Sequence, residues 1–91
     1  MHDKILTKHP AGKKGRDIEK VKYEDVVGHI LKCLKSGPLT FTEMVKCVEK
    51  KAALFRGSIP WYTESIKLDL EARDLIERVP GKKDRYLLTN R

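Results

Sequence analysis

Apolar residues recur at helical spacing in the first long stretch of this chain, residues 20–35. There they fall three or four positions apart, which places them on one face of a helix. Gly37 and Pro38 follow, and they predict the end of that helix, because glycine accepts a left-handed cap and proline cannot continue a helix. The apolar face consists of Tyr23, Val26, Val27, Ile30, Leu31 and Leu34.

A second helix is predicted over residues 41–53. Thr40 and Glu43 have the spacing of a capping box, in which the threonine oxygen accepts from the glutamate N–H and the carboxylate accepts from the threonine N–H. The preceding Leu39–Thr40 segment is long enough only for a stub of strand. The buried positions of this helix are predicted to be Phe41, Met44, Val45, Val48 and Ala52.

A third helix is predicted from about Pro60 to Asp74, after a connection over residues 54–58. Proline is tolerated in a first helical turn. The apolar residues form two groups on the helical wheel, so we expect much of the circumference to be covered, as in a helix wedged between two helices and a hairpin. One group is Trp61, Leu68, Ala72 and Leu75, and the other is Tyr62, Ile66 and Leu70.

The two ends of the chain have different patterns. Residues 76–79 and 85–89 are short strand-like runs, and the turn residues 80–84 between them predict a hairpin. Residues 1–19 hold two glycines, a proline and several basic side chains, and this composition predicts a basic N-terminal arm that precedes a domain over residues 20–91. Three apolar residues could still attach the arm to the domain: Ile5, Leu6 and Ile18.

Charge and cysteine content narrow the range of partners and compartments. The 91 residues carry a net charge of +7, which favours nucleic acid as a partner over an anionic membrane. No apolar run is long enough for a membrane span and no secretory signal is visible, so we expect a cytoplasmic protein. In that compartment Cys33 and Cys47 are expected to be reduced residues in or near a helical core. They could approach each other across two packed helices, which leaves a redox switch as an alternative.

The order helix, short strand, helix, helix, strand, basic turn, strand resembles the winged helix-turn-helix superfamily. The likeness is strongest at residues 37–45 (GPLTFTEMV) and 68–79 (LDLEARDLIERV). Residues 9–16, the pair Trp61-Tyr62 and residues 66–73 are also similar to a small bacterial family of winged-helix proteins without an assigned activity. The resemblance implies an α+β, mainly α fold, in which a three-helix core carries a C-terminal β-hairpin wing.

The resemblance also implies a mode of DNA binding. In winged-helix DNA binders the third helix enters the major groove and the wing contacts the backbone or minor groove. The helix then offers Arg56, Ser58, Trp61, Tyr62, Thr63 and Lys67, and the wing offers Arg78, Lys82, Lys83 and Arg85. The charge of the N-terminal arm adds Lys13, Lys14 and Arg16 as phosphate contacts.

The charge on the third helix argues for a second interpretation. Its most polar face carries Glu64, Glu71 and Asp74 against Lys67, so the positive charge lies in the arm and wing instead. We therefore expect backbone-dominated DNA binding with little reading of bases. The alternative is a protein-interaction module whose third helix faces a protein partner, and RNA association is a third interpretation. Trp61 and the following tyrosine could stack on bases, fill a partner pocket or belong to the core.

Residues for catalysis or metal binding do not cluster in the sequence. The three histidines lie apart in sequence, and no nucleophile motif or glycine-rich nucleotide loop is present. We therefore expect a binding protein that is not an enzyme and that uses neither a cofactor nor a metal. The sequence leaves its oligomeric state open.

Overall fold

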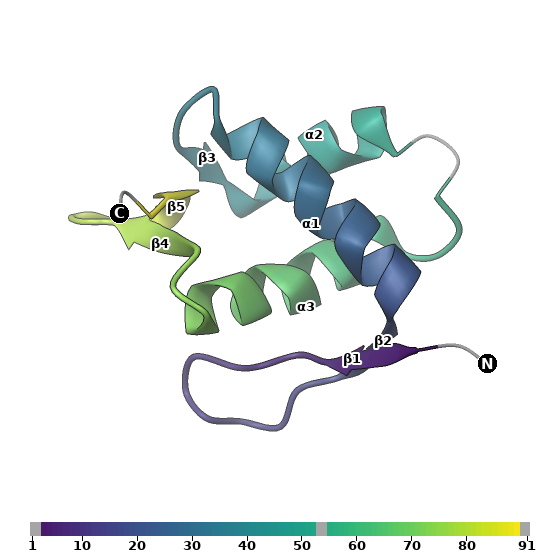
Figure 1. Ribbon diagram of the computed structural model, residues 1–91. Helices are drawn as coiled ribbons and strands as arrows, with labels where there is room; N and C mark the ends of the chain where they lie inside the picture. Colours follow the sequence, from purple (N-terminus) through teal and green to yellow (C-terminus); the bar gives the residue numbers. More distant parts are fainter. Residues whose placement is uncertain (1–2, 53–54, 90–91) are drawn as a thin grey trace.

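Three helices form the body of the protein, and two small antiparallel sheets flank them (Figure 1). The computed structural model describes residues 3–52 and 55–89, without the side chain of Lys83. The helices are α1 (Lys20–Leu34), α2 (Phe41–Lys51) and α3 (Ile59–Ala72). The strands are β1 (Lys4–Leu6), β2 (Asp17–Glu19), β3 (Leu39–Thr40), β4 (Ile76–Val79) and β5 (Lys82–Leu88). No helix among the described residues is long and apolar enough to cross a membrane.

The first two helices agree with their predicted bounds. α1 begins at Lys20 as predicted and buries its apolar stripe against α2 and α3. The capping box before α2 is confirmed, since Glu43 donates its N–H to Thr40 Oγ1 at 3.2 Å and Thr40 donates its N–H to Glu43 Oε1 at 2.9 Å. These two bonds satisfy the first backbone donors of α2 and fix where it starts. The predicted C-terminal residue of α2, Ala53, lies outside the described residues.

α3 ends at Ala72, two residues before the predicted end. Asp74 adopts a positive φ of 61°, and the Leu75 N–H bonds back to the Leu70 carbonyl at 2.9 Å. This backward bond stops the helix in the way a glycine cap normally does, and aspartate is one of the few other residues that tolerate the conformation. The chain then turns directly into β4.

A three-stranded sheet of order β3-β5-β4 follows the helices, so the predicted C-terminal hairpin is confirmed. β5 begins at Lys82, which makes the turn shorter than the predicted turn over residues 80–84. The β3 stub pairs with β5, with Leu39 opposite Tyr86. This pairing ties the hairpin to the start of α2 and leaves its turn to project from the body (Figure 1).

Residues 3–19 form a hairpin, so the prediction that this segment is an arm with little to pack is corrected. β1 and β2 pair with Ile5 opposite Ile18, and Ile18 retains only 2% of its exposure. Among the three apolar residues considered as attachments, Ile18 is the one that joins the core. The connection between the strands runs alongside α3 on the side away from α1 and α2 (Figure 1).

Cys33 of α1 and Cys47 of α2 form a disulfide, so the prediction that both are reduced is wrong. The packing of these two helices brings their Cα atoms to 6.2 Å, within the normal range for a disulfide. The expectation that the two residues approach each other across packed helices is confirmed, and the bond links the helices covalently.

Gly28 is an exposed glycine inside α1, and nothing lies within 4 Å of the Cβ that alanine would add there. Gly28→Ala should therefore raise the free energy of unfolding by about 0.5–1 kcal/mol, since alanine is the better helix former. Denaturant unfolding measures the change. Gly12→Ala is the contrasting variant, because Gly12 has a φ of +75° that alanine adopts only with strain, and it should lower stability. Equal shifts for the two variants would contradict the assigned backbone.

Candidate functional site

The connection between β1 and β2, residues 7–16, is pinned to itself and to α3. Thr7 and Arg16 bond to each other twice, from the Thr7 N–H to the Arg16 carbonyl at 2.9 Å and from the Arg16 N–H to Thr7 Oγ1 at 2.8 Å. Gly15 fits between them because a Cβ there would lie 1.6 Å from the Thr7 carbonyl oxygen. The Lys8 N–H donates to Asp69 Oδ1 of α3 at 2.8 Å. We call residues 7–16 the basic loop.

Asp69 is the residue that joins this loop to the helices. Its side chain is fully buried, and it also accepts from Tyr23 of α1 and from Arg73 Nε at 2.9 Å. Burial, together with the hydrogen bond to Asp69, raises the pKa of Tyr23 to about 12. The same carboxylate raises the pKa of Arg73, chiefly through their hydrogen bond. One acid therefore connects the basic loop, α1 and α3.

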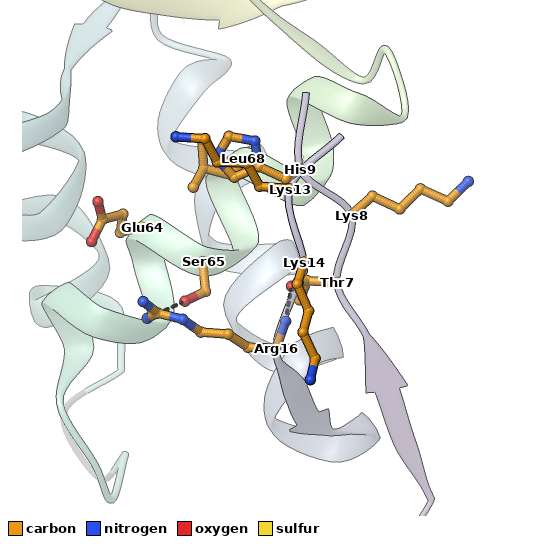
Figure 2. A pocket seen from close by; sticks show the side chains of 10 residues that line it. Thr7, Lys8, His9, Lys13, Lys14, Arg16, Glu64, Ser65 and Leu68 are labelled. Atoms are coloured by element: carbon orange, nitrogen blue, oxygen red, sulfur yellow. Dashed lines mark hydrogen bonds between the residues drawn. The ribbon is translucent and has the colours of Figure 1, made fainter. Parts of the chain in front are cut away.

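A cavity of about 280 Å³ lies between the basic loop and α3 (Figure 2). Four of its lining side chains are basic and one is acidic, so the cavity is a positively charged environment. In Figure 2 Lys13 and Arg16 extend across α3, whereas Lys8 points away from it. The lining consists of Thr7, Lys8, His9, Lys13, Lys14, Gly15, Arg16, Glu64, Ser65 and Leu68.

Arg16 is held by two side chains of α3. Its Nη1 donates to Ser65 Oγ at 3.3 Å, and its guanidinium carbon lies 4.9 Å from the centre of a Trp61 ring. Trp61 keeps 37% of its exposure and packs edge-on against Tyr62. A guanidinium stacked on an aromatic ring retains further N–H donors in a fixed plane, an arrangement suited to binding an anion.

Two acids of α3, Glu71 and Asp69, are paired with basic side chains. Glu71 accepts from Lys67 Nζ at 3.1 Å and from Arg78 Nε at 3.4 Å, and Asp69 pairs with Arg73. Glu64 is the acidic residue among those that line the cavity. The acidic excess read from the sequence therefore overstates the negative field beside the basic loop.

Two predicted groove-facing residues of α3 are buried, which corrects their assignment. Thr63 is fully buried and Lys67 retains 5% of its exposure. Lys67 Nζ donates to Tyr86 Oη at 3.1 Å and lies 4.4 Å from the centre of that ring. At Lys67 the helical wheel failed because Tyr86 of β5 packs over this side chain, and the ammonium group links the helix to the sheet.

The other predicted helix residues are spread over different surfaces. Ser58 caps α3 by accepting from the Trp61 N–H at 3.4 Å. Tyr62 packs against Phe55 with ring centres 5.0 Å apart, and it belongs to the partly buried shell of the core. Arg56 borders an open depression beside Val21 of α1, away from the basic loop. Of this group, Trp61 alone is placed beside the cationic cavity.

The four predicted wing residues do not form one cluster. Lys82 is exposed at the start of β5, close to the projecting turn. The backbone of Lys83 continues β5, and its side chain lies outside the described residues. Arg85 turns back toward the body, with Nη1 3.8 Å from Glu43 Oε1. Among the described wing cations, Arg78 therefore lies beside Glu71 of α3, whereas Lys82 lies at the projecting turn.

Lys8, His9, Ser65 and Asp69 were missed as site residues by sequence reasoning. The spacing of Asp69 and Arg73, four apart on a helix, is a signal that could have predicted their ion pair. The contacts that bring the basic loop to α3 span 61 positions between Lys8 and Asp69, and no local pattern encodes them.

Comparison with known proteins places residues 4–86 under the model of one protein family, which is described as a family of unknown function. No curated protein and no solved structure gives a significant match to the chain.

Proposed function

The chain belongs to that family, DUF6958, and we propose that it is a winged helix-turn-helix protein that binds duplex DNA mainly through phosphates. The basic loop and the adjoining flank of α3 are the proposed contact surface. The observation that carries the proposal is the cavity between them, whose lining residues include four basic ones and one acid.

The arrangement of elements supports the winged-helix part of the proposal. The chain order is α1, β3, α2, α3 and then the β4–β5 hairpin, and the β3 stub pairs with the far strand of that hairpin. This is the order expected when a helix-turn-helix is followed by a wing. In that geometry α3 occupies the recognition position, between the wing and the basic loop.

Charge pairing within the protein supports the DNA part. Phosphate affinity comes largely from the release of counterions by Lys and Arg, so unpaired acids beside the surface would oppose it. Asp69 and Glu71 are neutralised by partners on α3 and β4, while Lys13, Lys14 and Arg16 stay exposed. The surface is therefore more favourable to a polyanion than the segment charges indicate.

The same geometry explains why phosphates should dominate over bases. The basic loop covers one flank of α3, including the buried Ser65 and Asp69, so this helix cannot enter a groove without the loop. The remaining ridge presents Pro60, Glu64 and Leu68, which offer few hydrogen-bond donors to base edges. We therefore expect little difference in affinity between duplex sequences.

Titration of a fluorescent duplex across a range of salt concentrations tests the proposal. The affinity should fall with salt with a log–log slope of about −3 to −5, as expected for about four or five neutralised phosphates. The double variant Lys13→Gln/Lys14→Gln should weaken binding about tenfold or more and make the slope shallower by about 2. The matched control is Lys46→Gln/Lys50→Gln on the exposed side of α2, which removes the same charge and should change binding far less. Equal losses in both double variants, or no binding at low salt, would overturn the proposal.

A protein-interaction module remains the second candidate because of a different surface. Val21 of α1 keeps 78% of its exposure and lies beside Phe55 and Arg56 in an open depression that also contains Lys22, Glu24 and Asp25. A mixed apolar and charged surface of this kind suits a protein partner better than a phosphate backbone. If the protein does not bind duplex DNA, this second candidate is the one that we would test next.

A further inference from the structure

The backbone of the basic loop and the Arg16 side chain are held in place before any ligand arrives. The paired bonds between Thr7 and Arg16 close the loop, and the close approach at Gly15 keeps its two ends in contact. The Lys8 N–H bond to the buried Asp69 then fixes the closed loop against α3. Because this backbone order exists without a ligand, binding costs little additional backbone entropy.

The donors that face the cavity come from both of its walls. Arg16 reaches Ser65, and Lys13 extends across α3 beside Leu68 (Figure 2). A guanidinium, an ammonium and a hydroxyl line this hollow, and each is a group that donates to phosphate oxygens. The volume of about 280 Å³ admits a phosphate with a small substituent and excludes a base pair.

Glu64 lies on the same cavity and opposes an anion there. Its carboxylate is exposed, so water and salt screen much of the repulsion. Removing that charge should therefore strengthen anion binding modestly, whereas removing a cation should weaken it. A diffuse positive surface would give the same signs, so a defined site is distinguished by an equal loss of charge elsewhere, on α2, having no effect.

We infer that this cavity is a discrete phosphate site, which binds one phosphate group through Lys13, Arg16 and Ser65. The inference deepens the proposed function and rests on it for the source of the phosphate, a phosphodiester of bound duplex. The same chemistry would also accept a free phosphate monoester, and the test below separates the two sources.

The test titrates inorganic phosphate into the isotope-labelled protein at constant ionic strength and follows backbone amide shifts by NMR. The amides of residues 8–16 and of Ser65 should shift and saturate with a Kd on the order of 1 mM. Lys13→Gln should weaken binding about tenfold and Glu64→Gln should strengthen it about threefold. Lys50→Gln, a matched loss of charge on α2, should leave the phosphate affinity unchanged.

A second arm adds phosphate to the protein with duplex already bound. Loss of the phosphate-induced shifts supports a DNA phosphodiester as the occupant. Saturable phosphate binding by a protein that has no duplex affinity would overturn the DNA source, and with it the proposed function, while keeping the site.

A third outcome would contradict the phosphate site without contradicting DNA binding. Duplex binding without any saturable response to phosphate, or equal phosphate affinities for the Glu64→Gln and Lys13→Gln variants, would overturn the discrete site and leave DNA binding intact. Lys13 and Glu64 are both exposed, so neither variant should unfold the protein and the comparison stays interpretable.

Discussion

Replacing Asp69 by alanine should lower the free energy of unfolding by about 2–4 kcal/mol, because three donors lose a buried charged acceptor together. The donors are the Lys8 N–H, Tyr23 Oη and Arg73 Nε. Arg73 can turn to solvent, since its side chain is 35% exposed, and this keeps the cost below that of a fully buried ion pair. Thermal unfolding should show a decrease in Tm on the order of 10–20 °C for a chain of this size.

Asp25→Ala is the matched control for this variant. Asp25 is also an acid with an i,i+4 partner, His29 at 3.2 Å, but its side chain is 49% exposed. Its removal should change stability by no more than about 0.5 kcal/mol. The Asp69→Ala variant should also bind duplex more weakly than the wild-type protein, at a temperature where the variant is still folded, because its basic loop loses an attachment to α3. Similar Tm values for the two variants would show that Asp69 does not have the central role described.

Reduction of the disulfide between Cys33 and Cys47 should lower the free energy of unfolding by about 3 kcal/mol. The bond closes a loop across 14 positions, and its loss releases the unfolded chain from that constraint. The measurement is denaturant unfolding with and without a thiol reductant. Because α1 and α2 carry the bond and the basic loop lies beside α3, duplex affinity should stay the same while the protein remains folded.

The double variant Cys33→Ala/Cys47→Ala provides the control for that experiment. It lacks the bond, so its unfolding should be the same with and without reductant, and its midpoint should be close to that of the reduced wild-type protein. A wild-type midpoint that does not respond to reductant under conditions that reduce every disulfide would contradict the assigned bond.

The helices could be predicted because their signals are local. The apolar stripe of α1 repeats every three or four residues, and the capping box joins Thr40 to Glu43, three positions later. Both signals were confirmed. The early end of α3 was missed because it depends on Asp74 adopting a positive φ, which aspartate does only sometimes. The bounds of a helix could therefore be predicted wherever the residues at its end clearly prefer one backbone conformation.

The candidate site was predicted less well because it depends on contacts between distant segments. A helical wheel assigns Thr63 and Lys67 to solvent, but β5 and the body of the protein cover them. Composition assigned residues 1–19 to an arm, while the hairpin is attached by the buried Ile18 and by the bond from Lys8 to Asp69. The predicted phosphate contacts of that segment, Lys13, Lys14 and Arg16, are exposed, but their placement against α3 could not be predicted.

The most direct test of the central claim is a map of amide shifts when an unlabelled duplex is added to the isotope-labelled protein. The claim is that DNA binds the face made by the basic loop and the adjoining flank of α3. The amides of residues 8–16 and those of Trp61 and Ser65 should then shift most, while those of α2 change little. Shifts that centre on Val21, Phe55 and Arg56 instead, with the basic loop unchanged, would contradict the account.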